Sequence, residues 1–371
     1  MAAEGSPAVP RPAEPAPGRR EVERCLEAIT RLSAALADEV RALAPADWER
    51  PSNCPPWRVR DLAAHIVSSG EGFVANIRRG LASAAATEPG RGEPAPVAAA
   101  RPGLGAPDRL GPATSGLDES ARLERQRELE SADPALLARA LQTVTHAFVS
   151  LYDDLSAADL ATICFHRRGN RSVAWYAAHR LAEVAFHRWD LQRSLGQSPT
   201  LDADVASLLL PTLLESNAPR TYAAGLSPER GTGERYWLAV SGDPTARWRV
   251  TIEPERLDVR RASAPAASSS ATSAASPSDN PADSAAAAPA DSADTDPADS
   301  AGADAADSAG ADAADLGAAS PADLEVSGAA PDLALLVYGR AQLDTLAQTG
   351  AVRLAGNHAL VARFAQLFPR P

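Results

Sequence analysis

The sequence contains no lysine, so arginine supplies every permanent side-chain positive charge among its 371 residues. Alanine, proline and glycine are abundant instead, a composition typical of a high-GC genome such as an actinobacterial one. We therefore interpret the missing lysine as coding bias rather than as a physical adaptation.

Cysteine is also scarce, with only Cys25, Cys54 and Cys164. Their odd number and spacing exclude a disulfide framework and a zinc knuckle. No run approaches the ~18 apolar residues of a membrane span, and residues 1–20 lack the apolar core of a signal peptide. We expect a cytoplasmic protein with reduced thiols and no membrane partner.

Negative charge is concentrated in one segment. The formal net charge is −12, and residues 262–322 contain ten aspartates and no basic residue. The remainder is nearly neutral, so no basic surface indicates nucleic-acid binding. Residues 298–305 and 306–313 repeat ADSAGADA without bulky apolar side chains. This composition predicts a disordered insertion rather than a solenoid.

Apolar residues at three- and four-residue steps predict helices over most of residues 21–195. The first predicted helix begins near Glu21. The others span Trp57–Ala82, Glu119–Leu155 with a break near 131–134, and Ser172–Leu195, after which Gly196 ends the last helix. Residues 83–118 are predicted to form a long loop. Four such segments favour a four-helix bundle.

The pattern changes to short strands after residue 230. Strands are predicted at 236–240, 248–252, 257–259 and 323–326, and helices at 331–338 and 357–368. We expect an α+β two-domain protein. Its predicted parts are a disordered tail (1–20), a metal-binding helical domain (21–200), a linker (201–230) and a small C-terminal domain (231–371) interrupted by the insertion (262–322).

The segment RLAEVAFHRWDL, residues 180–191, contains the strongest candidate site. Glu183 and His187 are four residues apart and therefore share one helix face. They form either a helix ion pair or part of a metal site, and their apolar neighbours favour the metal, because a buried carboxylate needs a strong partner. His65, on another predicted helix, is a third ligand candidate. Two histidines and one carboxylate from facing helices suit a divalent ion with open positions.

Other residues near this segment allow alternatives. Asp190 either orients the His187 ring or pairs with Arg193, and His179 is a possible substitute ligand. No role is assigned to His146, His166 and His358. The sequence lacks a nucleophile elbow, a phosphate-binding glycine loop and an H-E-x-x-H motif.

Two motifs resemble signatures of the mycothiol-dependent maleylpyruvate isomerase family. They are PSNCPPWRVRDLAAHI at 51–66 and RLAEVAFHRWDLQRSLG at 180–196, and ADLEVSGAAPDLALLVYGR at 322–340 is similar to that family's tail domain. Pro56 stands where the family usually has glycine. The resemblance implies a DinB-like four-helix bundle followed by a small α/β domain, and it leaves out residues 83–118 and the insertion.

The resemblance also implies chemistry. It assigns a divalent metal, usually zinc, to His65, Glu183 and His187, and gives Arg340 a carboxylate of the substrate or thiol to bind. The implied activity is mycothiol-dependent cis–trans isomerisation or S-transfer on a small electrophile. A non-catalytic metal-binding or regulatory protein and a metal-dependent hydrolase are the alternatives. The expected form is a monomer or a homodimer.

Overall fold

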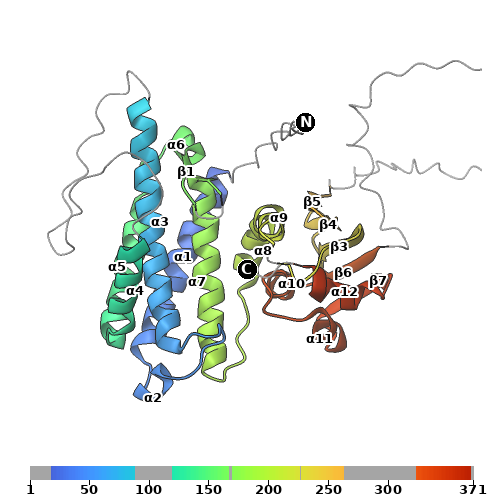
Figure 1. Cartoon of the computed structure of the whole chain (residues 1–371), viewed down its shortest axis with the longest axis horizontal. Coiled ribbons are helices and arrows are strands. Elements are labelled where there is room, and N and C mark those ends of the chain that lie inside the picture. The colour runs from blue at the N-terminus through green and yellow to red at the C-terminus, as the bar shows by residue number, and fades with distance from the viewer. Residues whose placement is uncertain (1–17, 88–118, 167–168, 226, 263–322, 369–371) are drawn as a thin grey trace, which may run out of the picture.

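Four long helices form the N-terminal half of the chain (Figure 1). The computed structural model describes residues 18–87, 119–166, 169–225, 227–262 and 323–368. The long helices are α1 (Arg19–Arg41), α3 (Val59–Thr87), α5 (Pro134–Ser150) and α7 (Val173–Ser194). Helices α1 and α3 each pack against both α5 and α7. The predicted four-helix bundle is therefore confirmed.

Shorter elements connect the bundle helices. They are α2 (Pro45–Trp48), α4 (Glu119–Glu130), α6 (Ala157–Ala161), β1 (Ile163–Cys164) and β2 (Arg171–Ser172). Helix α4 packs against α3, and the antiparallel pair β1–β2 leads directly into α7. Within the described part of the chain, no helix combines the length and apolar character that crossing a bilayer requires.

Helix α7 occupies the position that its sequence predicts. Ser172 caps it by accepting a hydrogen bond from the Trp175 backbone N–H at 3.2 Å, and Gly196 ends it with a left-handed φ of 78°. Most of its side chains are buried on all sides, as expected of a helix in the interior of a bundle. Any polar side chain on its inner faces therefore lies between helices.

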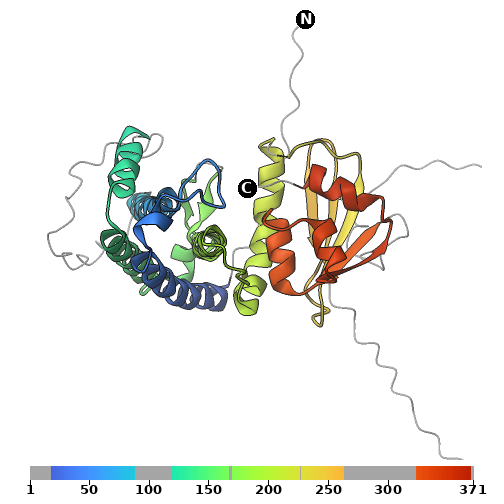
Figure 2. The same ribbon diagram turned by 90° about the horizontal axis from the view of Figure 1, so that it is seen from below.

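Two segments differ from their predictions. Helix α3 continues to Thr87, because the alanine-rich residues after Leu81 extend it; the rest of the predicted loop, residues 88–118, lies outside the described residues. The expected linker at 201–230 contains α8 (Ala203–Pro211), the π-helical turn η1 (Thr212–Asn217) and α9 (Ala218–Ala223). Figure 2 shows these helices between the bundle and the sheet. The domain boundaries themselves stay a prediction.

The C-terminal half contains a five-stranded sheet in the order β5-β4-β3-β6-β7. The strands are β3 (Glu234–Val240), β4 (Arg247–Ile252), β5 (Leu257–Arg261), β6 (Leu324–Gly328) and β7 (Val352–Gly356). Only β3 and β6 pair in parallel among these strands. The expected α+β half is confirmed, with β7 as an additional strand. The predicted insertion lies, from residue 263 to 322, outside the described residues.

Three helices accompany this sheet: α10 (Ala330–Val337), α11 (Leu343–Gln348) and α12 (Leu360–Leu367). Helix α10 packs against β3, β6 and α8, and the Phe364 ring of α12 lies 5.1 Å from the Tyr236 ring of β3. After α10, the Tyr338 ring stacks on the Phe186 ring of α7 at 3.7 Å and 5°. This stack brings residues 338–340 of the C-terminal half against the bundle.

Candidate metal centre

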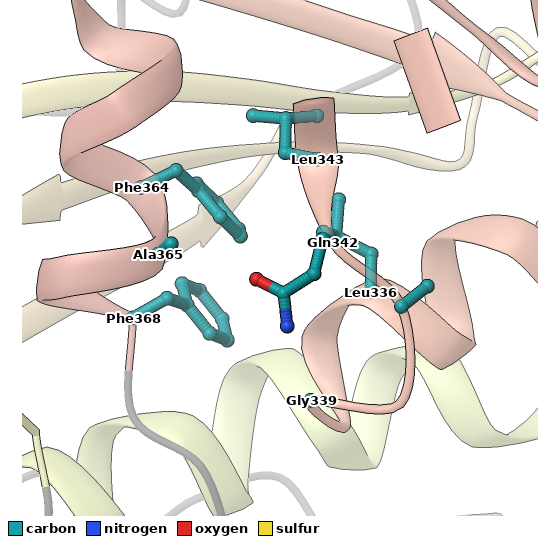
Figure 3. Close-up of a pocket in the computed structure, with 8 residues that line it drawn as sticks. Leu336, Gly339, Gln342, Leu343, Phe364, Ala365 and Phe368 are labelled. Atoms are coloured by element: carbon teal, nitrogen blue, oxygen red, sulfur yellow. The ribbon is translucent and has the colours of Figure 1, made fainter. Parts of the chain in front are cut away.

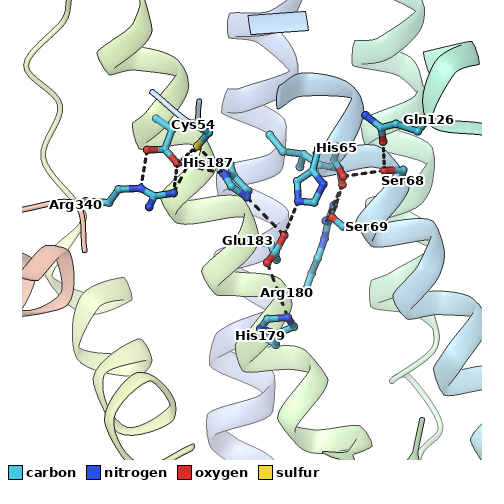
Figure 4. Close-up of polar contacts among 12 residues, drawn as sticks. Cys54, His65, Ser68, Ser69, Gln126, His179, Arg180, Glu183, His187 and Arg340 are labelled. Carbon is cyan, nitrogen blue, oxygen red and sulfur yellow. Dashed lines mark hydrogen bonds and ion pairs between the residues drawn. The ribbon is translucent and has the colours of Figure 1, made fainter. Parts of the chain in front are cut away.

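The structure brings the three predicted ligands together (Figure 4). His65 lies on α3, and Glu183 and His187 lie on the facing side of α7. Glu183 Oε2 is 3.2 Å from His65 Nε2 and 3.7 Å from His187 Nε2. One candidate ligand atom from each residue lies within 4.8 Å of the others. The three side chains singled out from the sequence therefore lie in one cluster.

The chemistry of this cluster fits a divalent metal. The side chains of His65, Glu183 and His187 are 21%, 13% and 9% exposed. Burial opposes ionisation of Glu183, but the hydrogen bond with His65 and the nearby histidine charges outweigh it and hold the carboxyl pKa well below its usual range. An ionised carboxylate with two imidazole nitrogens is a donor set that zinc favours.

Asp190 fixes the orientation of the His187 ring. Its Oδ2 lies 3.1 Å from His187 Nδ1. Because an ionised carboxylate only accepts hydrogen bonds, Nδ1 carries the proton, and Nε2, on the Glu183 side, is the nitrogen available to a metal. Arg193 instead donates to the backbone carbonyl of Gln197. Of the two roles considered for Asp190, the structure shows the contact with His187.

The Asp190 side chain is fully buried and has four polar neighbours. Asn53 Nδ2 donates to Oδ1 at 2.8 Å, and the Cys54 thiol donates to Oδ2 at 3.1 Å. Arg340 donates from Nε and Nη2 to the two oxygens at 2.8 and 2.9 Å. Burial alone would raise the pKa of Asp190, but hydrogen bonds from His187 and Arg340 lower it to about 2. The carboxylate is therefore ionised at neutral pH.

A second group of potential ligands, Cys54, His187 and Asp190, lies beside the first. Burial and the charge of Asp190 raise the pKa of the Cys54 thiol to about 12, so it stays protonated. The Arg340 guanidinium also lies 3.5 Å from its sulfur. A cation at this position would meet a fixed positive charge and a neutral thiol. This second group is therefore less suited to a cation than the group of His65, Glu183 and His187.

Some contacts of the site were missed from sequence because they come from distant segments. The Trp57 ring lies 4.7 Å from the His65 ring, and Asn53 and Cys54 reach Asp190 from the same turn before α3. In the sequence these residues stood only within the motif at 51–66, and no contact was predicted for them. Arg180 is fully buried one turn before Glu183 and donates to the Ile66 carbonyl at 2.8 Å; its place in an apolar helix was the available signal.

The remaining histidines have different surroundings. His179 Nε2 lies 3.8 Å from Glu183 Oε1, the oxygen that does not face His65, and its ring stacks on Trp175. The His166 ring is buried 5.4 Å from that of His179. His179 is therefore a neighbour of the candidate ligand Glu183, outside the group of three candidate ligand atoms.

A small cleft lies elsewhere in the C-terminal half (Figure 3). Leu336, Gly339, Gln342, Phe364 and Phe368 are among its lining residues, and its volume is about 20 Å³. That volume accommodates about one water molecule. The cleft is too small to be considered as a second ligand site.

Residues 29–192 match the family model described as the mycothiol maleylpyruvate isomerase N-terminal domain, and residues 305–369 match the SCP-2 sterol transfer family. The crystal structure of the mycothiol-dependent maleylpyruvate isomerase is similar at 13% identity and a TM-score of 0.46, over 90% of this chain and 92% of that one.

YfiT from Bacillus subtilis, described as a probable metal-dependent hydrolase with an unusual four-helix bundle topology, is similar at 16% identity and a TM-score of 0.35. This likeness covers 51% of the present chain and 94% of YfiT. No curated protein matches the chain. Both structural likenesses are remote, whereas the first family match contains all three candidate ligands. Residues 29–192, somewhat less than half of the chain, are therefore similar to the mycothiol maleylpyruvate isomerase N-terminal domain.

Proposed function

We propose that this protein is a metal-dependent enzyme that uses mycothiol or a similar low-molecular-weight thiol to modify a small electrophile. The reaction is cis–trans isomerisation or S-transfer. The observation that carries the proposal is the convergence of His65, Glu183 and His187, within 4.8 Å of one another, inside the segment that matches the family. A bound divalent ion, with Zn²⁺ as the expected metal, would lower the pKa of a coordinated thiol.

The residues of the chain have separable roles in this proposal. His65, Glu183 and His187 supply the three donors, and Asp190 keeps the His187 Nε2 lone pair directed toward them. Trp57 packs against the His65 ring and limits its movement. Three protein donors leave one position on a four-coordinate ion, for the thiol, and a second one, for a substrate oxygen, when the coordination expands to five.

Arg340 keeps its predicted role as the residue that binds a carboxylate of the substrate or thiol. Its Nε and Nη2 atoms already donate to Asp190, so this role falls to Nη1. A guanidinium holding one internal carboxylate can still recognise a second one through its remaining N–H groups.

Elemental analysis of the purified full-length protein tests the metal first. We expect one divalent ion per chain in the unmodified protein and loss of that ion in Glu183→Ala. Glu27→Ala is the matched control, because Glu27 is an exposed glutamate on α1, and it should keep the ion. Full-affinity binding by Glu183→Ala would contradict the site.

Turnover of a small electrophile such as maleylpyruvate, with and without mycothiol, tests the chemistry. The proposal requires consumption that depends on the thiol and is lost in Glu183→Ala. Hydrolysis of an ester or amide in thiol-free buffer would favour the hydrolase alternative. A fully loaded protein that is inactive with every thiol would favour a binding or regulatory protein.

A further inference from the structure

The Asp190 carboxylate joins the two halves of the chain beside the candidate metal centre, because it contacts both His187 and Arg340, which Figure 4 labels. Asp190 belongs to α7, as do Glu183 and His187, whereas Arg340 follows α10 in the C-terminal half. All three proposed ligands come from the helical half. The contact between Asp190 and Arg340 therefore links a residue of the other half to the proposed ligand His187 through a single side chain, that of Asp190.

The ion pair has the geometry of a strong one. Arg340 Nε and Nη2 donate to separate oxygens of Asp190 at 2.8 and 2.9 Å, which fixes the plane of the carboxylate. The Asp190 side chain has no exposed surface and that of Arg340 is 18% exposed. Solvent therefore cannot replace the guanidinium readily, and loss of one partner leaves a buried charge.

The carboxylate that Arg340 fixes also holds a ligand. Asp190 Oδ2 accepts from both Arg340 Nη2 and His187 Nδ1, at 2.9 and 3.1 Å. Without Arg340, the carboxylate loses its two-pronged partner and keeps only the single donors of Asn53 and Cys54 besides His187. The acceptor of the His187 ring is then held less firmly. Hydrogen-bond partners of this kind orient metal-bound histidines and raise their affinity for the ion.

The C-terminal half in turn fixes the position of Arg340. Its backbone N–H donates to the Leu335 carbonyl at 2.8 Å, and Gly339 makes the turn with a φ of 73°. Tyr338, two residues earlier, stacks on Phe186, the residue before His187. The guanidinium therefore reaches Asp190 only when residues 338–340 lie against α7.

We infer that Arg340 is a positioning residue of the metal centre, through which packing of the C-terminal half against α7 raises the metal affinity of ligands that all belong to the helical half. This inference rests on the proposed metal site. The ion pair with Asp190 thereby has a role distinct from binding a substrate carboxylate. Loss of the first role lowers zinc affinity, and loss of the second raises the substrate KM.

Zinc affinity of the full-length protein, measured by competition with a chromophoric chelator, tests the inference. Replacing a partner of a metal-bound histidine typically weakens binding ~10–100-fold, and we expect about tenfold in Arg340→Gln and at least tenfold in Asp190→Asn. The double variant should bind no more weakly than Asp190→Asn, because both changes break one chain of contacts. Arg353→Gln is the control, since Arg353 is exposed on β7.

The Co²⁺-substituted protein adds a readout of ligand geometry. The visible absorption of bound Co²⁺ should change in Arg340→Gln and stay unchanged in Arg353→Gln. Arg340→Lys keeps the charge but lacks the two-pronged geometry, so its zinc affinity should fall between those of the unmodified protein and Arg340→Gln. If Arg340→Gln does not fold, Arg340→Lys decides the question in the same assays.

Three results would overturn the inference: zinc affinity in Arg340→Gln within twofold of the unmodified protein, additive losses in the double variant, or a raised substrate KM with unchanged zinc affinity. The last result would leave Arg340 as a carboxylate-binding residue only. An unmodified protein that binds no zinc would contradict the metal site itself, so the two failures are distinguishable.

Discussion

Cys54 lies next to a candidate ligand, yet its chemistry is that of a hydrogen-bond donor. Burial and the negative charge of Asp190 raise the pKa of its thiol to about 12, and the opposing effect of Arg340 is smaller. At neutral pH the sulfur therefore carries a proton and donates it to Asp190 Oδ2. A nucleophilic cysteine needs the opposite surroundings, with a lowered pKa.

Substitution of Cys54 checks this interpretation. A serine hydroxyl can also donate to Asp190, so Cys54→Ser should keep bound zinc and retain thiol-dependent turnover within about threefold. Cys54→Ala removes the donor and should lose more of both. A hundredfold loss of turnover in Cys54→Ser with zinc still bound would instead make Cys54 a catalytic residue.

Asp190 should make the free energy of unfolding of the metal-free protein fall at acidic pH. Its folded pKa of about 2 is lower than the ordinary 3.8, so the unfolded chain takes up this proton first as the pH falls. The contribution is fully present above the unfolded pKa and is lost as the pH falls from about 4 to 2. Its size is of the order of 2 kcal/mol.

Urea unfolding of the metal-free protein between pH 2 and 6 measures this contribution. The free energy of unfolding should fall less steeply with acid in Asp190→Asn than in the unmodified protein. Asp204→Asn changes an exposed aspartate and should follow the unmodified curve. Parallel curves for Asp190→Asn and the unmodified protein would show that His187 and Arg340 do not stabilise the carboxylate.

At the level of whole elements, local signals determine what sequence can predict. Helix α7 was predicted to within a residue because its cap, Ser172, and its terminating Gly196 are adjacent to it. Helices α8 and α9 were missed because prolines interrupt the helical spacing of their apolar residues. In addition, α10, which packs on α8, lies more than a hundred residues later in the sequence. The pair Glu183 and His187 was found because both residues lie in one predicted helix. The contacts of Asn53, Trp57 and Arg340 were missed because their partners lie far away in the sequence.

The packing of α3 against α7 depends on a glycine. A Cβ atom at Gly70 would lie 2.9 Å from Cζ and Nη2 of Arg180. Arg180 has no exposed surface and donates to the Ile66 carbonyl, one residue after His65. Its guanidinium therefore has little room to move. Gly70 and Arg180 together set the separation of the two helices that carry the proposed ligands.

Two alanine substitutions in α3 separate packing from helix propensity. Alanine in a helix interior is ordinarily ~1 kcal/mol more favourable than glycine, and Gly72→Ala should show part of this gain, since nothing lies within 4 Å of its added Cβ. Gly70→Ala should lose ~1–3 kcal/mol by overpacking and weaken zinc binding. Equal unfolding free energies for the two variants, measured in urea, would contradict this account of the packing.

At the scale of the whole molecule, all pairings within the five-stranded sheet are made by strands that lie outside the acidic segment, residues 263–322. In the described residues, β3 pairs with β4 and β6, and β6 pairs with β3 and β7. Strand β5 ends at Arg261 and β6 begins at Leu324, three positions away in the sheet. Three strand spacings amount to about 14 Å. Because β5 and β6 run in the same direction, the connection crosses over β4 and β3, and such a crossover needs about a dozen residues, which 15 residues provide.

Replacing residues 263–322 with a 15-residue Gly/Ser linker should therefore preserve the fold and the zinc stoichiometry. The shorter connection lowers the entropic cost of closing the loop, at ~0.6 kcal/mol per halving of its length. We expect the free energy of unfolding in urea to rise by about 1 kcal/mol. A loss of stability or of bound zinc would show that the acidic segment contributes to the folded state.

The two ring nitrogens of His187 face different parts of the molecule. Nε2 lies toward Glu183, and Nδ1 lies toward Asp190 and the guanidinium behind it. In a sample labelled with ¹⁵N-histidine, the Nε2 resonance would follow ion binding and the Nδ1 resonance would follow attachment of the C-terminal half. With only six histidines in the chain, such a spectrum is sparse enough to assign. One imidazole thus provides two spectroscopic reporters, one for each side of the ring.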